Sequence, residues 1–117
     1  MTQIEDIIKG KEGKTLEFKR DLSSFNPIMR TLIAFANTAG GILVIGRGDN
    51  GVITGIDDVL QAEERIANAI ADSISPAMMP DIEIITIEAK EVLILRVAHW
   101  SGPFYLKSEG PEDGVYI

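Results

Sequence analysis

The chain has 117 residues, 45% of them hydrophobic and 25% charged, which is the composition of one folded domain rather than of a disordered segment. It contains no cysteine, so disulfides, thiolate catalysis and cysteine-based zinc sites are excluded. The net charge of −7 argues against nucleic-acid binding by the surface as a whole. The charge is uneven, because residues 1–47 carry seven Lys or Arg and five Asp or Glu, whereas residues 48–117 carry four and thirteen.

The first predicted elements are a short helix and a strand. Residues 2–8 place isoleucines on one side of a helix. Residues 15–19 alternate between apolar and polar, so Leu16 and Phe18 are expected to face a core and the polar side chains between them to face the other way.

A longer helix and a buried strand are predicted next. Asn26 is expected to cap the helix, with Pro27 at its first position, where a missing N–H costs no hydrogen bond. The apolar stripe of this helix ends at the pair Gly40-Gly41. Residues 42–45 form an apolar run between glycines, which is typical of a central strand buried on both faces.

Residues 46–51 read Gly-Arg-Gly-Asp-Asn-Gly and satisfy the dinucleotide-binding pattern Gly-x-Gly-x-x-Gly. That pattern holds a pyrophosphate only where a helix begins directly after it. Here the β-branched residues 52–54 follow instead. We therefore interpret the glycines as a tight hairpin turn, with residues 52–54 as the return strand.

The second half of the chain is predicted to begin with a helix. Asp57 or Asp58 caps it, and Ser75-Pro76 ends it, because proline disfavours helical backbone in the residue before it. Residues 82–87 and 92–97 then read as two strands joined by a turn.

Apolar residues at 104–106 and 115–117 predict a terminal hairpin. The predicted fold class is α+β, with two helices packed on a mixed β-sheet in the order β-α-β-β-α-β-β plus the terminal hairpin. The last residues lie within a predicted strand, so we expect residues 1–117 to be one domain in the N-terminal part of a longer protein.

Two segments resemble the Schlafen AlbA_2 family, which pairs Glu-x-x-x-x-Glu-Phe-Lys with a downstream Phe-Ala-Asn-Thr-x-Gly-Gly and Ile-Gly. Residues 12–19, 35–41 and 45–46 match this pattern, and the resemblance extends over residues 12–117. It implies an Alba-like domain of a prokaryotic transcriptional regulator that binds nucleic acid, with DNA favoured over RNA, and that requires no cofactor. With no signal peptide and no apolar run of membrane-spanning length, a cytoplasmic location is the default expectation.

The nuclease branch of the resembling family uses two glutamates five residues apart and an aspartate after the Ile-Gly strand. Glu12 and Glu17 match the glutamates, and Asp49 stands near the position of the aspartate. The resemblance implies that these three would be the catalytic residues and would bind Mg²⁺ or Mn²⁺, since hard divalent cations take carboxylate oxygens. The alternative interpretation is that Glu17 pairs with Lys19 and that Glu12 is an exposed turn residue.

Five basic residues are candidates for contacting the phosphates of a nucleic acid, because Lys and Arg supply the sequence-independent part of such affinity. They are Lys14, Lys19, Arg20, Arg30 and Arg47. The alternative is that they form a solvated face, with Arg47 flanking an exposed hairpin.

Two other polar or aromatic residues are given structural roles. Asn37 is expected to cap the end of its helix, and Trp100 to anchor a packed loop. Beside nucleic-acid binding, two functions stay open: a metal-dependent endoribonuclease, and a structural or dimerising module that forms a homodimer. Catalysis by this domain is less favoured than nucleic-acid binding without catalysis.

Overall fold

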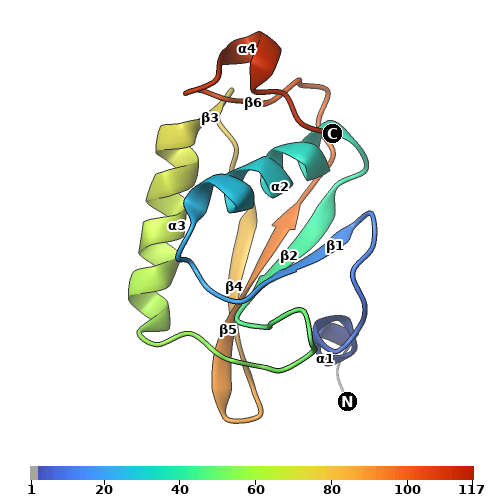
Figure 1. The fold of residues 1–117 in the computed structure, drawn as a ribbon, viewed down its shortest axis with the longest axis vertical. Helices are drawn as coiled ribbons and strands as arrows, with labels where there is room; N and C mark the ends of the chain where they lie inside the picture. Colours follow the sequence, from blue (N-terminus) through green and yellow to red (C-terminus); the bar gives the residue numbers. More distant parts are fainter. Residues whose placement is uncertain (1–2) are drawn as a thin grey trace.

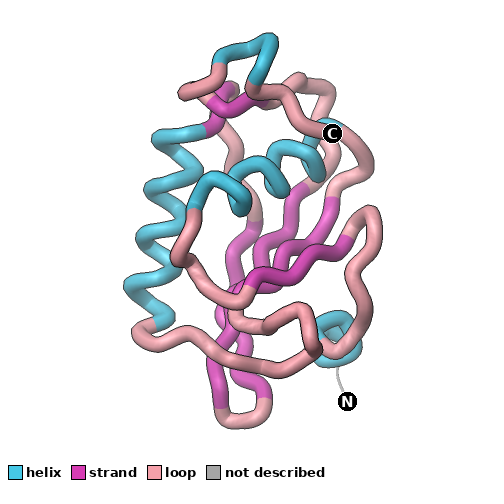
Figure 2. Tube along the Cα trace, in the orientation of Figure 1, coloured by secondary structure: helices cyan, strands magenta, loops and turns pink. Residues whose placement is uncertain are grey.

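A mixed four-stranded sheet forms the centre of the molecule (Figure 1, Figure 2). The computed structural model describes residues 3–117. The strand order is β1-β2-β5-β4, with β1 and β2 parallel and the other pairs antiparallel. The strands are β1 (Leu16–Lys19), β2 (Gly41–Ile45), β4 (Asp81–Ile87) and β5 (Lys90–Val97). This arrangement confirms the predicted α+β class.

Helices cover this sheet, and a second, two-stranded sheet lies at one end of the molecule (Figure 1). No helix within residues 3–117 has both the length and the apolar composition needed to cross a bilayer. The helices are α1 (Gln3–Ile8), α2 (Phe25–Asn37), α3 (Val59–Ser73) and α4 (Gly110–Asp113), and the small sheet pairs β3 (Ile74–Ser75) with β6 (Tyr105–Leu106).

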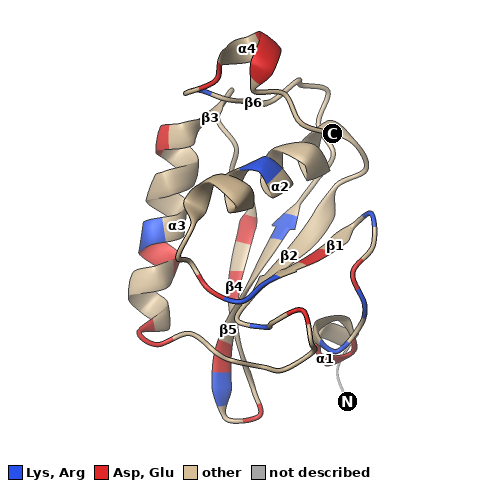
Figure 3. Ribbon diagram, viewed as in Figure 1, with Lys and Arg blue, Asp and Glu red and all other residues tan. Residues whose placement is uncertain are grey.

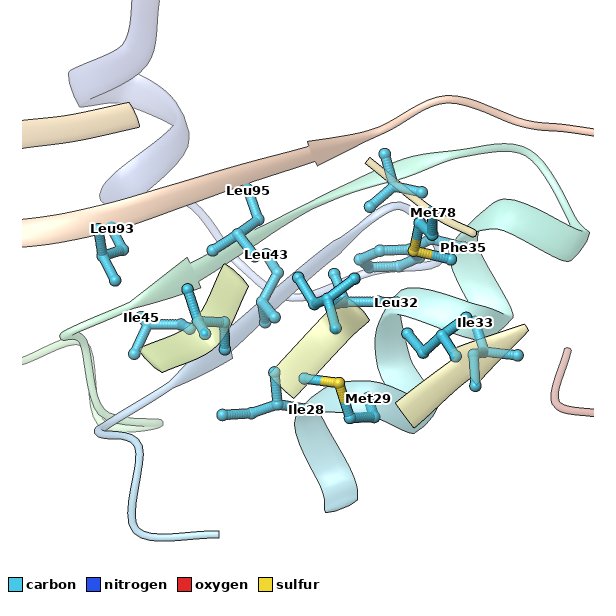
Figure 4. Close-up of a cluster of buried hydrophobic side chains, with 14 of the residues drawn as sticks. Ile28, Met29, Leu32, Ile33, Phe35, Leu43, Ile45, Met78, Leu93 and Leu95 are labelled. Atoms are coloured by element: carbon cyan, nitrogen blue, oxygen red, sulfur yellow. The ribbon is translucent and has the colours of Figure 1, made fainter. Parts of the chain in front are cut away.

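The sheet is apolar on both faces, which explains the uninterrupted apolar run of β2. Leu43 and Ile45 point into the larger core, where they meet α2 and α3, and Figure 4 shows side chains of α2 packed against them. Val44 points the other way, into a smaller core that it shares with Ile8 of α1 and Phe18 of β1. All five side chains are at most 2% exposed, and burying each is worth about 1.5–3 kcal/mol.

The apolar stripe of α2 is confirmed, but the helix begins earlier than predicted. It starts at Phe25, and Ser24 precedes it without a side-chain capping bond. Asn26 and Pro27 therefore lie inside the first turn, where the proline still replaces an N–H that has no helical partner. For α3 the predicted cap is correct, since the Asp58 side chain accepts from the backbone N–H of Gln61.

The predicted turn after β2 is present, but the segment that was expected to return as a strand does not form one. The N–H of Gly51 donates to Gly48, and residues 47 and 53 form a single isolated bridge. Regular pairing stops there because Thr54 turns back on Gly46, to which it donates both its backbone N–H and its hydroxyl. The next helix begins only at Val59, so the glycine pattern does not present a helix N-terminus to a dinucleotide.

The predicted terminal hairpin does not form. β6 pairs with β3, α4 follows, and Val115–Ile117 belongs to no strand. The Asn37 side chain accounts for this, because it donates to the carbonyls of Phe104 and Tyr116 and accepts from the N–H of Phe104. Asn37 thus holds the C-terminal segment against α2, instead of capping its own helix as predicted.

The hairpin of β4 and β5 is confirmed, with a two-residue turn at Glu88 and Ala89, both at positive φ. The prediction for Trp100 is wrong. Its backbone N–H donates to Ala36, but its side chain is 64% exposed and anchors no packed loop.

Candidate nucleic-acid interface

A cleft lies where the parallel strands β1 and β2 end. The carboxyl ends of parallel strands meet at one edge of a sheet, so residues that follow β1 and β2 converge there. The cleft has a volume of about 990 Å³. Its lining includes Lys11, Glu12, Glu17, Lys19, Arg20, Arg47, Asp49, Asn50 and Thr54. Figure 3 shows both charge signs gathered around the end of β1 and the turn after β2.

Gly46 determines how the chain enters this cleft. The N–H groups of Gly46 and Arg47 both donate to the carbonyl of Lys19, which joins the end of β2 to the end of β1. Gly46 has a φ of +117°, a conformation that side-chain-bearing residues rarely adopt. Regular alternation would place Arg47 on the same face as Ile45, whereas its guanidinium lies over the ring of Phe18 on the opposite face.

Arg47 is therefore not the exposed hairpin residue that one interpretation of the sequence expected. It is 7% exposed, and its guanidinium carbon lies 3.7 Å from the centroid of the Phe18 ring. Its Nε is buried without a hydrogen-bond partner, and within residues 3–117 it forms no ion pair. Arg47 is a buried cation whose Nε has no hydrogen-bond partner among residues 3–117.

Three carboxylates share the cleft with these cations. Glu12 comes from the loop after α1, Glu17 from β1 and Asp49 from the turn after β2. Partial removal of solvent raises the pKa of the Glu12 carboxyl, and the neighbouring carboxylates of Glu17 and Asp49 raise it further. None of the three has an ion-pair partner in the described part of the chain.

The acidic residues fit a metal only in part. Their chemistry is that of Mg²⁺ or Mn²⁺ ligands, and the pKa of Glu12 responds to both of the others. However, among residues 3–117 no three His, Cys, Asp or Glu side chains converge in the arrangement of a formed metal site. A divalent cation held by Glu12, Glu17 and Asp49 would require these side chains to move closer together.

The raised pKa of Glu12 leads to a prediction about stability. Because the folded state holds this proton more tightly than the unfolded chain, the group stabilises the fold below its ordinary pKa of 4.5, and this contribution is lost as pH rises through the raised value. Glu12→Gln should therefore raise Tm slightly near pH 8, with the gain disappearing below about pH 4.5. Thermal unfolding followed by circular dichroism across this range measures it.

Glu64→Gln is a matched control, because Glu64 is exposed on α3 and does not line the cleft. Its Tm difference from the parent should not follow this pH dependence. If the Tm differences of the two variants from the parent depended on pH in the same way, the acidic neighbours of Glu12 would not be destabilising its charged form.

Two of the predicted phosphate-binding residues lie outside the cleft. Lys14 is exposed in the turn before β1 and does not line it. Arg30 lies on α2, where it pairs with Glu109 at 3.4 Å and lies 5.5 Å from the centroid of the Tyr116 ring. Tyr116 also donates a hydrogen bond to Glu109, so the contacts of Arg30 are with the C-terminal segment.

Three charged or polar side chains that line the cleft were not among the predicted site residues, namely those of Lys11, Asn50 and Thr54. Lys11 lies beside Glu12, and its positive charge was the only feature of the sequence that could have indicated a place in the site. Asn50 accepts from the N–H of Val52 and so shapes the turn, and the single hydroxyl proton of Thr54 is shared between the carbonyls of Gly46 and Arg20, the latter at 3.2 Å. These last two contacts depend on how the turn folds back, which no spacing in the sequence reveals.

Comparison with known proteins identifies the family to which this fold belongs. The chain belongs to the Schlafen AlbA_2 family, whose model "Schlafen, AlbA_2" matches residues 12–117. It is similar to the N-terminal domain of a RecG-related protein from Nitrosomonas europaea, named after an ATP-dependent DNA helicase. The TM-score is 0.77 and the identity 25%, covering 99% of this chain and 88% of that one.

A second similar structure is the DIP2311 protein from Corynebacterium diphtheriae, with a TM-score of 0.66 and 22% identity. The match covers 91% of this chain but 23% of that longer chain. At this identity the likeness establishes the shared fold alone.

Proposed function

We propose that this domain binds nucleic acid through the cleft at the ends of β1 and β2, with DNA preferred to RNA, as part of a transcriptional regulator. The observation that carries the proposal is the set of cations in the cleft. Lys11, Lys19, Arg20 and Arg47 line it, and Arg47 is buried there with no anionic partner among residues 3–117. A phosphate group supplies the negative charge that pairs with a guanidinium and the oxygens that accept hydrogen bonds from its N–H groups.

Two further points support the proposal. The excess of acidic residues lies mostly in residues 48–117, and Figure 3 shows acidic residues along β4, at the β4–β5 turn and on α4, away from the cleft. The negative net charge therefore restricts binding to a local site instead of excluding it. The similar domain from Nitrosomonas europaea carries the name of a DNA helicase relative, which favours DNA.

Binding to a fluorescein-labelled oligonucleotide, measured by anisotropy at increasing salt, tests the proposal. A few phosphate contacts should make log affinity fall linearly with log salt, with a slope of about −0.9 per contact for duplex and about −0.7 for single strands. Duplex DNA, single-stranded DNA and RNA of one sequence should be compared. Absence of binding to all three at low salt would refute the proposal.

A second function is favoured by one observation, the gathering of Glu12, Glu17 and Asp49 in one cleft, where burial and the two neighbouring carboxylates raise the pKa of Glu12. Carboxylates grouped beside phosphate-binding cations are the components of a phosphodiesterase. A bound Mg²⁺ or Mn²⁺ would supply an activated water and stabilise charge on the phosphate. The chain's own part would be to hold the phosphate with Lys19, two residues after Glu17 on β1.

Incubation with structured RNA and Mn²⁺ separates the two functions. We expect no cleavage by the parent domain, because the carboxylates are not arranged as a formed metal site. Cleavage that persists in Glu64→Gln but is lost in Glu17→Gln would contradict this expectation and make the domain an endoribonuclease. Cleavage of equal rate in the parent and in Glu17→Gln would come from a contaminating nuclease.

A further inference from the structure

The guanidinium of Arg47 lies between a ring and a turn, but its Nε has no hydrogen-bond partner among the residues that the structure describes. The Phe18 ring covers one side of the guanidinium, and the turn at Gly51 approaches it so closely that a Cβ there would lie 3.4 Å from Nη2. Stacking of this kind fixes the plane of a guanidinium and leaves its edge free for hydrogen bonds. A buried guanidinium normally has carboxylate partners, because unpaired burial of a charge is costly.

The carboxylates of the same cleft do not take this role. Glu12, Glu17 and Asp49 line it with Arg47, yet none of them pairs with Arg47 within the described residues. Burial and the neighbouring carboxylates of Glu17 and Asp49 raise the pKa of Glu12, as expected for acids that lie near one another. The arginine edge and the acidic group are therefore separate features, and the arginine is available to a ligand.

Burial limits which phosphate can reach Arg47. A phosphodiester within a strand carries a sugar on each side and presents two free oxygens, so it contacts exposed cations most readily. A terminal phosphomonoester has three free oxygens on one side and a charge of about −1.5 to −2 near neutral pH, so it can enter a recess end-on. Its oxygens match the paired N–H groups of a guanidinium edge.

We infer that Arg47 binds the terminal phosphate of a single nucleic-acid strand, so that the cleft recognises phosphorylated strand ends. This inference rests on the proposed function and names its substrate class. The more exposed cations Lys11, Lys19 and Arg20 would contact the next phosphates of the strand. A cleft of about 990 Å³ has the size of a site for one small ligand, which suits the end of a strand.

The experiment compares single-stranded oligonucleotides of one sequence that differ only at their ends. One carries a 5′-phosphate, one a 3′-phosphate and one hydroxyl groups at both ends, and each competes with a labelled strand in an anisotropy assay. We expect one of the phosphorylated strands to bind about tenfold more tightly than the hydroxyl strand. In Arg47→Lys, which keeps the charge but loses the paired N–H groups, this preference should fall below about threefold.

Arg47→Met tests whether the arginine is merely a structural contact. Because it removes an unsatisfied buried charge, we expect Tm at or above that of the parent, together with loss of the end preference. Arg65→Met is the matched control, since Arg65 lies 5.3 Å from the ring centroid of Phe25 and does not line this cleft. It should keep the preference.

The outcomes separate this inference from the proposed function. Binding of all three strands with equal affinity, weakened by salt, would leave nucleic-acid binding intact and overturn the role of Arg47. Binding of none of them at low salt would remove both. A preference for phosphorylated ends that persists in Arg47→Lys and Arg47→Met would also overturn the inference, because another residue would then hold the terminal phosphate.

Discussion

Charge reversal at Lys19 and Arg20 should weaken binding of duplex DNA by roughly 10- to 100-fold at low salt. Both residues line the cleft at the end of β1, and the variant replaces two attractions to phosphate with two repulsions. Each lost contact should also make the plot of log affinity against log salt shallower by about 0.9. Anisotropy titrations of the parent and of Lys19→Glu/Arg20→Glu measure both quantities.

The matched control is Lys14→Glu/Lys107→Glu. It changes the net charge of the protein by the same amount, but both residues are exposed and neither lines the cleft. We expect it to keep most of the affinity and the parent slope. If the two double variants weakened binding equally, the effect would come from net charge, and the cleft would have no special role.

Gly46→Ala should lower the free energy of unfolding by roughly 2–5 kcal/mol, more than the same substitution at Gly110 or Gly13. Two costs add: a side chain at a φ of +117°, and a Cβ placed 2.8 Å from Cγ1 of Val92 in the smaller core. For a chain of this size such a loss lowers Tm by roughly 10–20 °C. Denaturant titration and thermal unfolding, followed by circular dichroism, give both values.

Two other glycines separate the two costs. Gly110 has a φ of +85° with no atom within 4 Å of an added Cβ, so Gly110→Ala should show the backbone strain alone, about 1–2 kcal/mol. Gly13 has neither feature, so Gly13→Ala should stay within about 0.5 kcal/mol of the parent. Equal stability of the Gly46 and Gly13 variants would show that the bend after β2 is not constrained as described.

The parts of the fold that could be predicted are those whose sequence pattern repeats over a whole element. The stripe of α2 from Ile28 to Ala36 and the apolar run of β2 are both clear patterns, and both elements lie where expected apart from the earlier start of α2. The terminal hairpin was predicted wrongly because its two apolar segments look like strands. Instead, the side chain of Asn37, which is at least 67 residues away in sequence, donates hydrogen bonds to one backbone carbonyl in each of these segments.

The candidate site was predictable only to the level of residue type. The family pattern identifies Glu12, Glu17 and Asp49, and the structure brings all three to one cleft. No pattern indicated that Arg47 is buried or that Arg30 pairs with Glu109, because both depend on contacts between distant segments. The reversal of Arg47 towards Phe18 arises from one positive φ at Gly46, which a sequence permits but does not require.

The most direct test of the central claim is an NMR titration of the ¹⁵N-labelled domain with a single-stranded oligonucleotide that carries a terminal phosphate. The claim is that phosphate binds in the cleft at the carboxyl ends of β1 and β2. It predicts that the amide signals of residues 11–12, 17–20 and 46–54 shift in proportion to bound strand, while those of α3 and of the β3–β6 sheet stay in place. Shifts concentrated on α3, α4 or the β3–β6 sheet, with the cleft signals unchanged, would contradict it.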